Sequence, residues 1–253
     1  MNFPVTENIA KSQRHTSFYL ACGMSEATPI IFLHGWPELS ISWRHQLPTF
    51  ASLGFRALAP DMRGYGRSSI YSRHEDYALE QVVADMIELL DAIGAERAVW
   101  VGHDWGKGKP ARTSFVRANG GWFGPQNTAP DVPRDATVLS EMDEHQYVAA
   151  LEPNGFFGPD SWYMNADANA AFAKHAETSW RLTMPVLFMH GAYDYVCETI
   201  DSRLAEPMRA NCANLTEVTI LSGHWMAQEK PIYVNAALAK WLALQLRARW
   251  AVS

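Results

Sequence analysis

An aspartate stands at the centre of the glycine-flanked segment Gly102-His103-Asp104-Trp105-Gly106. A sharp turn from a strand into a helix needs small residues two positions before and after its centre, and such a turn exposes the central residue above the sheet. A carboxylate in that place can attack a saturated carbon and form a stable alkyl ester, whereas its attack on an acyl carbonyl would give an anhydride. The segment therefore predicts a nucleophilic aspartate that acts on epoxides or alkyl halides. A chance turn around a buried carboxylate is the alternative.

Two later residues could complete a triad with Asp104. Asp194 and His224 follow predicted strands, and the order nucleophile, acid, histidine is the one found with this kind of turn. His224 would activate the water that attacks the ester, and Asp194 would orient the imidazole. Asp201 and Glu198 are competing carboxylates, but they are less well placed for the end of a strand.

Ester hydrolysis passes through an oxyanion, and backbone N–H groups are the expected donors to it. The N–H of Trp105, directly after the nucleophile, and the N–H of Trp36 in an earlier loop are the candidates for this oxyanion hole. His34 and Pro37 in the same loop are expected to shape it rather than to react. An opened epoxide leaves as an alkoxide that a tyrosine can protonate, whereas a halide needs no proton, so a tyrosine would separate the two reactions.

Apolar runs alternate with segments of helical periodicity along most of the chain. The expected strands are 17–24, 29–33, 55–59, 98–101, 185–190 and 215–221, and the expected helices are 43–53, 78–93, 141–151, 166–180, 201–209 and 231–249. This alternation predicts an α/β fold with an open, mostly parallel sheet and helices on both faces. The side chains of His34, Asp104, Asp194 and His224 would then gather at the carboxyl ends of the strands.

The composition excludes several classes of protein. The 253 residues are 48% hydrophobic, and 21 basic against 27 acidic residues give a net charge of −6, so nucleic acid is not expected as a partner. The sequence has no signal-like start and no apolar stretch long enough for a membrane span, and its three cysteines lack metal-like or paired spacing. We expect a cytoplasmic enzyme that uses water and a small apolar substrate, with no cofactor and no metal. The oligomeric state is left open.

The motifs resemble the epoxide hydrolase family of the α/β-hydrolases. The matching segments span nearly the whole chain and include His34-Gly35-Trp36-Pro37, 61–69 (DMRGYGRSS), the Asp104 turn, 158–165 (GPDSWYMN), Tyr193-Asp194 and Gly223-His224-Trp225. The resemblance implies that Asp104 is the nucleophile, that Asp194 and His224 assist it, and that Tyr163 is one of two cap tyrosines that polarise the epoxide oxygen. A merely packed aromatic side chain is the alternative for Tyr163.

The chain departs from this family directly after the nucleophile. The resemblance implies a helix under the turn, a further strand and the first half of a helical cap, which carries the second tyrosine. Here the turn is followed by Lys107-Gly108-Lys109-Pro110. Glycine and proline disfavour a helix, and two lysines disfavour burial, so this segment is not expected to begin a buried helix. The interval between Asp104 and Asp194 is too short for all of these elements. We therefore expect an internal deletion that begins at about residue 107. Tyr147 and Tyr71 are available tyrosines, but neither lies in a segment that matches the lost one.

The deletion shapes the expected domain organisation and activity. Residues 1–106 and 183–253 are expected to form the two parts of the hydrolase core, and residues 107–182 the remnant of a truncated cap. Exposing a few hundred Å² of apolar surface at ~25 cal/mol per Å² costs several kcal/mol, so we expect a destabilised protein of reduced activity. A haloalkane or haloacid dehalogenase and an inactive truncated variant remain as alternatives.

Overall fold

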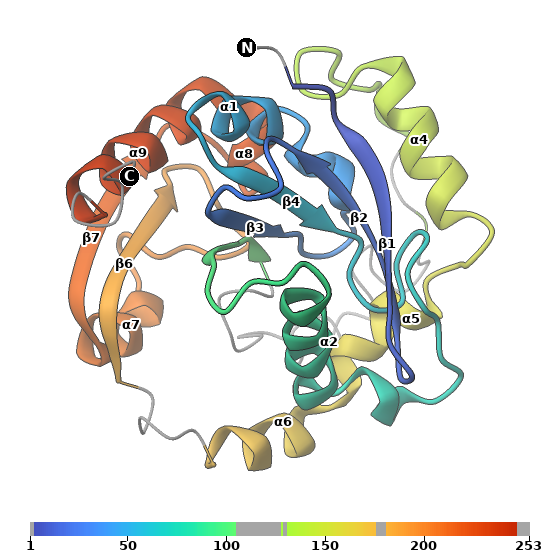
Figure 1. Cartoon of the computed structure of the whole chain (residues 1–253). Coiled ribbons are helices and arrows are strands. Elements are labelled where there is room, and N and C mark those ends of the chain that lie inside the picture. Colours follow the sequence, from blue (N-terminus) through green and yellow to red (C-terminus); the bar gives the residue numbers. More distant parts are fainter. Residues whose placement is uncertain (1–2, 105–127, 129–130, 176–180, 247–253) are drawn as a thin grey trace.

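The computed structural model describes residues 3–104, 128, 131–175 and 181–246, and its strands form two separate sheets (Figure 1). The larger sheet has the order β1-β2-β4-β3-β5, and the smaller one pairs β6 with β7. The strands are β1 (Thr6–Lys11), β2 (Thr16–Cys22), β3 (Pro29–Leu33), β4 (Arg56–Pro60), β5 (Val99–Gly102), β6 (Leu182–Gly191) and β7 (Cys212–Ile220).

The larger sheet is mixed rather than mostly parallel. Strands β3, β4 and β5 pair in parallel, but β1 with β2 and β2 with β4 pair antiparallel. The strand β1 was not expected from the sequence, because its side chains are largely exposed and give no buried pattern. The two strands of the smaller sheet are parallel, as expected.

Helices cover both faces of the sheets, as the alternation predicts. In Figure 1, α1, α8 and α9 lie on one face and α2 on the other, with α6 next to the end of α2. The helices are α1 (Gln46–Ser52), α2 (Leu79–Ala92), α4 (Glu141–Leu151), α5 (Phe157–Ser161), α6 (Ala166–Ala173), α7 (Glu206–Asn211), α8 (Met226–Glu229) and α9 (Pro231–Gln245). Short 3-10 turns are η1 (Ser40–Trp43), η2 (His74–Tyr77), η4 (Trp162–Met164) and η5 (Arg203–Ala205).

The bounds of most elements agree with the sequence-based expectation to within a few residues. The helix expected at 201–209 is instead a 3-10 turn followed by the short α7, and α6 ends at Ala173. The end of the helix expected at 166–180 falls partly outside the described residues. No helix among the described residues is long and apolar enough to cross a membrane.

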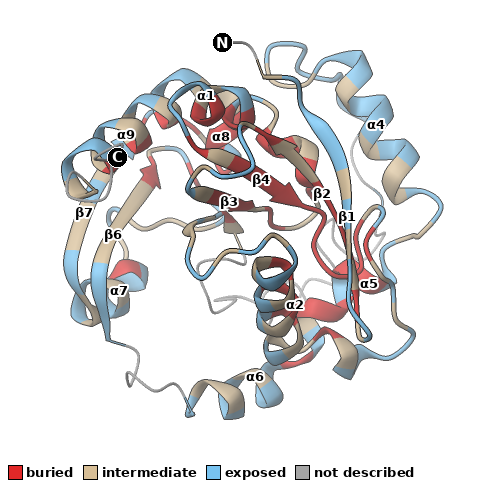
Figure 2. Ribbon diagram, in the orientation of Figure 1, coloured by how far each residue is buried: buried red, intermediate tan, exposed pale blue. Residues whose placement is uncertain are grey.

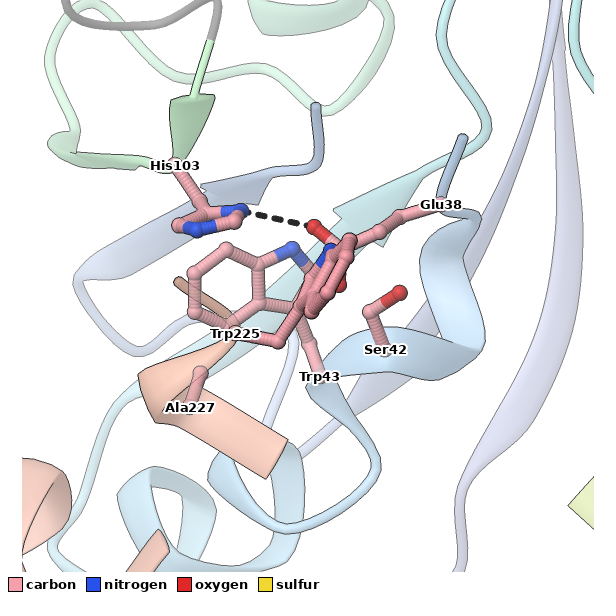
Figure 3. A pocket seen from close by; sticks show the side chains of 6 residues that line it. All are labelled: Glu38, Ser42, Trp43, His103, Trp225 and Ala227. Carbon is pink, nitrogen blue, oxygen red and sulfur yellow. Dashed lines mark hydrogen bonds and ion pairs between the residues drawn. The ribbon is translucent and has the colours of Figure 1, made fainter. Parts of the chain in front are cut away.

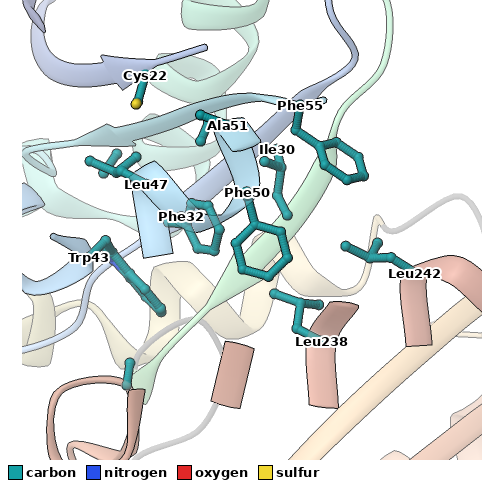
Figure 4. Close-up of a cluster of buried hydrophobic side chains, with 13 residues drawn as sticks. Cys22, Ile30, Phe32, Trp43, Leu47, Phe50, Ala51, Phe55, Leu238 and Leu242 are labelled. Carbon is teal, nitrogen blue, oxygen red and sulfur yellow. The ribbon is translucent and has the colours of Figure 1, made fainter. Parts of the chain in front are cut away.

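The main hydrophobic core lies between the larger sheet and α1 and α9 (Figure 4). Ile30 and Phe32 of β3 are completely buried there, and Phe32 packs on Trp43 and Phe50 with ring centroids 5.1 and 5.6 Å apart. Leu242 of α9 is also completely buried. This core fixes the carboxyl ends of the central strands, from which the candidate functional loops begin.

A second cluster lies on the opposite face, under α2. Val82, Met86 and Leu89 are buried at the spacing of one helical face, as the sequence pattern indicates. The helices of the expected cap remnant differ from one another. The helices α4 and α6 have no buried residue, whereas Trp162 of η4 is buried in this cluster.

The break between the two sheets falls where the sequence predicts a missing strand. Among the described strands, β5 pairs only with β3, and β6 pairs only with β7. In Figure 1, β6 stands apart from β3 and β4. Residues 105–127 lie outside the described part of the chain. The expected loss of the helix after Asp104 therefore stays a prediction.

Candidate active site

The Asp104 turn has the strained backbone that the motif predicts. Asp104 follows β5 and has a φ of 58°, the only positive φ of a non-glycine residue in the described chain. Gly35 of the preceding loop lies directly against it, and a Cβ atom added to Gly35 would be 2.2 Å from the Cβ of Asp104. Glycine at position 35 is therefore a condition for the position of the half-buried carboxylate at position 104.

The three predicted triad residues meet in space. The Nε2 atom of His224 lies 3.1 Å from Oδ2 of Asp104, and its Nδ1 atom lies 3.0 Å from Oδ2 of Asp194. These atoms come from loops after β5, β6 and β7, so the site spans the break between the sheets. The arrangement has the geometry of a nucleophile, a base and an orienting carboxylate.

Asp194 is held by backbone amides as well as by His224. Its Oδ1 atom accepts hydrogen bonds from the N–H groups of Val196 and Cys197, at 3.0 and 2.8 Å. The competing carboxylate of Glu198 instead accepts N–H groups of its own turn, including that of Asp201. The structure thus places Asp194 beside the imidazole and gives Glu198 a local capping role.

The electrostatics of the site favour a protonated imidazole in the free protein. Burial alone lowers the pKa of His224, but the hydrogen bonds to Asp104 and Asp194 outweigh it and raise the pKa to about 9. The pKa values of Asp104 and Asp194 are lowered, because these bonds and the imidazolium charge outweigh the opposing effect of burial. The Asp104 carboxylate is therefore ionised near neutral pH.

One of the two predicted oxyanion donors is in place. The backbone N–H of Trp36 points at Oδ1 of Asp104, at 3.3 Å, and leaves Oδ2 to His224. The indole N–H of Trp36 donates instead to Oδ1 of Asp160, at 3.1 Å. The second predicted donor, Trp105, lies outside the described residues.

His34 shapes the loop that carries Trp36, as expected. Its Nδ1 atom lies 2.9 Å from the carbonyl oxygen of Gly35, and its Nε2 atom accepts the N–H of Met62 at 2.9 Å. The imidazole therefore connects this loop to the segment 61–69 and has both nitrogens engaged.

Tyr163 lies in η4, on the segment that the resemblance assigns to the cap. The preceding Trp162 donates its indole N–H to the carbonyl of Arg63 at 3.0 Å, which ties η4 to the segment 61–69. Burial raises the pKa of Tyr65 well above its ordinary value, and the nearby Tyr163 and Asp104 add to this effect. Tyr65 is thus within electrostatic reach of both residues.

The two other tyrosines considered from the sequence are engaged elsewhere. Tyr71 donates its hydroxyl to the carbonyl of Arg14 at 2.8 Å, near the β1–β2 hairpin. The Tyr147 hydroxyl of α4 meets Ser42 Oγ at 2.5 Å, and burial raises its pKa. Both hydroxyls therefore have partners other than the triad residues.

A buried polar network beneath the imidazole was not predicted from the sequence. The Nδ1 atom of His103 lies 2.7 Å from Oε2 of Glu38 (Figure 3). Its Nε2 atom lies 2.7 Å from the carbonyl oxygen of His224. Glu38 also accepts the side-chain amide of Gln228 at 2.8 Å, and Gln228 accepts Arg44 at 2.7 Å. The network fixes the backbone of His224. Its members are up to 190 residues apart in the chain, so no local pattern could reveal it.

The fold and the site define an α/β-hydrolase. The family described as "alpha/beta hydrolase fold" matches residues 28–107, which end where the sequence predicts the deletion. Epoxide hydrolase A of Mycobacterium tuberculosis is 31% identical over 307 aligned positions, which cover 89% of this chain and 94% of the relative. This alignment is longer than the 253-residue chain, so the relative has positions that this chain lacks.

Other relatives match in part or in fold. Epoxide hydrolase B of M. tuberculosis is 51% identical over 100 residues, which are 40% of this chain and 26% of the relative. Bifunctional epoxide hydrolase 2 of Sus scrofa is 26% identical, and the chain spans about half of its length (53%). The crystal structure of epoxide hydrolase A from Mycobacterium thermoresistibile is 25% identical, with a TM-score of 0.79 over 94% of this chain and 98% of that one. The chain therefore belongs to the epoxide hydrolase family, and it is a hydrolase.

Proposed function

We propose that this protein hydrolyses small apolar epoxides to vicinal diols through an alkyl ester on Asp104. The observation that supports this most directly is that the two oxygens of the Asp104 carboxylate have different partners. Oδ1 faces the Trp36 N–H at 3.3 Å, and Oδ2 faces Nε2 of His224 at 3.1 Å. One oxygen is thus placed to attack and the other to become the oxyanion.

In the first step, Oδ2 of Asp104 attacks an epoxide carbon and the ring C–O bond breaks. The oxygen leaves as an alkoxide and takes the hydroxyl proton of Tyr163, which is restored from solvent. An alkoxide is a far stronger base than a phenolate, so the transfer is favourable. The product of this step is a hydroxyalkyl ester of Asp104.

In the second step, His224 becomes the base. Esterification removes the negative charge of Asp104, so the pKa of His224 falls from its value of about 9 and the imidazole loses its proton to solvent. Neutral His224 then takes a proton from water, whose oxygen attacks the ester carbonyl. The N–H groups of Trp36 and Trp105 receive the oxyanion, and the diol leaves with the proton returned by His224.

The deletion reduces this activity in our proposal. Residues 1–106 and 183–253 supply the two parts of the core, and residues 107–182 supply a cap remnant that carries Tyr163 but not the second tyrosine. Because Asp104 and His224 belong to different sheets, their 3.1 Å contact depends on packing across the break. The expected result is slower turnover than in relatives that retain the full segment.

A single turnover in water labelled with oxygen-18 tests the covalent step. With protein in excess over styrene oxide, hydrolysis of the ester places one labelled oxygen in the peptide that contains Asp104, while the peptide with Asp194 stays unlabelled. The measurement is mass spectrometry of the digested protein. If the diol forms with its new oxygen from solvent and Asp104 stays unlabelled, direct attack by water replaces the proposal.

The two alternatives give different results in the same assay. A dehalogenase would release halide from a haloalkane and form no diol from the epoxide. The engagement of the Trp36 indole N–H with Asp160 argues against halide binding at that group. An inactive variant would give neither product nor label over long incubation.

A further inference from the structure

A thiol lies next to the nucleophile and the base. Among the residues that the structure describes, Asp104, Cys197 and His224 form a group in which one carboxylate oxygen, one sulfur and one imidazole nitrogen all lie within 4.8 Å of one another. Cys197 is not part of a disulfide. The spacing of the cysteines in the sequence gives no sign of this proximity, because the three residues are brought together only by the loops after β5, β6 and β7.

The distances are close to those of a tetrahedral zinc site. Zinc bonds of about 2.0 Å to nitrogen and oxygen and about 2.3 Å to sulfur place neighbouring ligand atoms about 3.3–3.6 Å apart. Nε2 of His224 and Oδ2 of Asp104 are already 3.1 Å apart. The sulfur lies at most 4.8 Å from the other two ligand atoms, so it has to move by up to about 1 Å through a change of side-chain torsion together with a shift of its loop.

The surrounding hydrogen bonds are those that orient metal ligands. His224 donates its other ring N–H to Asp194, and this carboxylate is itself held by the amides of Val196 and Cys197. A histidine with its second nitrogen on a carboxylate has its ring orientation fixed and its basicity raised. Trp36 holds Oδ1 of Asp104, so Oδ2 is the oxygen that faces the shared centre.

We propose that Asp104, Cys197 and His224 form a three-ligand binding site for a zinc(II)-type cation. Binding releases the thiol proton and any proton on Nε2 to solvent, and a water molecule completes the tetrahedron. The cation occupies the attacking oxygen and the basic nitrogen together, so it excludes epoxide hydrolysis. It also joins the ends of three strands from both sheets and therefore stabilises the fold across the break.

Binding can be measured without turnover, so the outcome does not depend on the proposed reaction. The probes are Zn²⁺ alone, competed against a chromophoric chelator, and Co²⁺ alone, followed by its absorption spectrum. We expect one equivalent of metal per chain, a thiolate-to-cobalt charge-transfer band in the near ultraviolet, and a rise in the melting temperature with Zn²⁺. Cys197→Ser is expected to weaken Zn²⁺ binding at least about tenfold and to remove the charge-transfer band.

Cys212→Ser is the matched control, because Cys212 is also a half-buried thiol outside any disulfide. It should leave both the affinity and the band unchanged. Circular dichroism of the metal-free variants verifies folding, and Cys197→Ala is the second variant if Cys197→Ser does not fold. The proposal is overturned if no equivalent of Zn²⁺ binds, or if the Cys197 variants keep the wild-type affinity and band.

Discussion

The two sheets of this protein differ in how well they are buried. In β3 and β4 the central residues are completely buried between helices, whereas β6 and β7 are mostly half-buried or exposed along their length (Figure 2). Both sheets carry part of the same site: Asp104 follows the first, and Asp194 and His224 follow the second. The proposed nucleophile thus follows a well-buried sheet, whereas the proposed base and its orienting carboxylate follow a sheet that is less buried.

The largest expected effect separates the chemical roles of the two sides. In His224→Gln, Asp104 keeps its carboxylate but no base activates water, so the alkyl ester forms and persists. We expect steady turnover to fall at least about 1,000-fold while the protein gains the mass of one substrate. Intact-protein mass spectrometry after exposure to styrene oxide measures this. Asp104→Asn is the matched variant and should gain no such mass. An unmodified His224→Gln protein with lost turnover would contradict the assigned roles.

If a segment has been deleted after residue 106, inserting the corresponding segment of a relative should reduce the difference in burial between the two sheets. A chimera that carries, after residue 106, the additional segment of epoxide hydrolase A from Mycobacterium tuberculosis is expected to gain several kcal/mol in the free energy of unfolding. The reason is that a strand and a helix would cover apolar surface at the break. A glycine-serine insertion of equal length is the control. Urea unfolding and turnover are measured on both chimeras. Equal stability of the two would show that the break is not the weak point.

A matched pair of core substitutions compares the sheets directly. Phe32 of β3 is completely buried, whereas Phe188 of β6 is half-buried and lies against His190 with ring centroids 4.7 Å apart. Phe32→Ala should cost about 3–5 kcal/mol, and Phe188→Ala about half of that or less, because less contact is lost. Chemical denaturation followed by circular dichroism measures both. A larger cost at Phe188 would reverse the comparison.

The smallest expected effect is the pH dependence of the free energy of unfolding. The folded pKa of His224 is about 9, above the value of 6.5 of an unperturbed histidine. Its contribution to stability is therefore fully present below pH 6.5 and is lost as the pH rises through 9, and its full size is on the order of 3 kcal/mol. Urea unfolding at pH 6.5 and 9.5 should show this loss in the wild type, and His224→Gln should show less of it. Parallel pH profiles of the two proteins would contradict the elevated pKa.

Sequence reasoning predicted the parts of the site that depend on local pattern. The glycine-flanked turn at Asp104 and the strand ends before Asp194 and His224 have short-range signals, and the structure brings these three side chains together. The strand β1 was not predicted because none of its side chains is buried, so its sequence lacks the alternation of apolar and polar residues that indicates a strand. The mixed direction of the larger sheet was also missed, since antiparallel pairing with β2 depends on tertiary context.

Long-range contacts had no signal in the sequence. The contact of His103 with Glu38 joins residues 65 positions apart, and the proximity of Cys197 to the triad depends on two loops from the smaller sheet. Cysteine spacing is informative only where ligands are close in sequence, and here they are not. The resemblance predicts that a strand is missing, but it does not predict how the remaining strands pair. The separation into two sheets was therefore not predicted.

The break also affects how the protein behaves at high concentration. Among the described strands, β5 and β6 each have a ladder partner on one side only, and β6 contains the uncharged run Pro185-Val186-Leu187-Phe188-Met189. Backbone groups on such an edge can pair with the same edge of another copy, and an apolar run strengthens this association. The total hydrolase activity in a cell would then depend more on the fraction of the protein that stays unaggregated than on the turnover rate of each molecule.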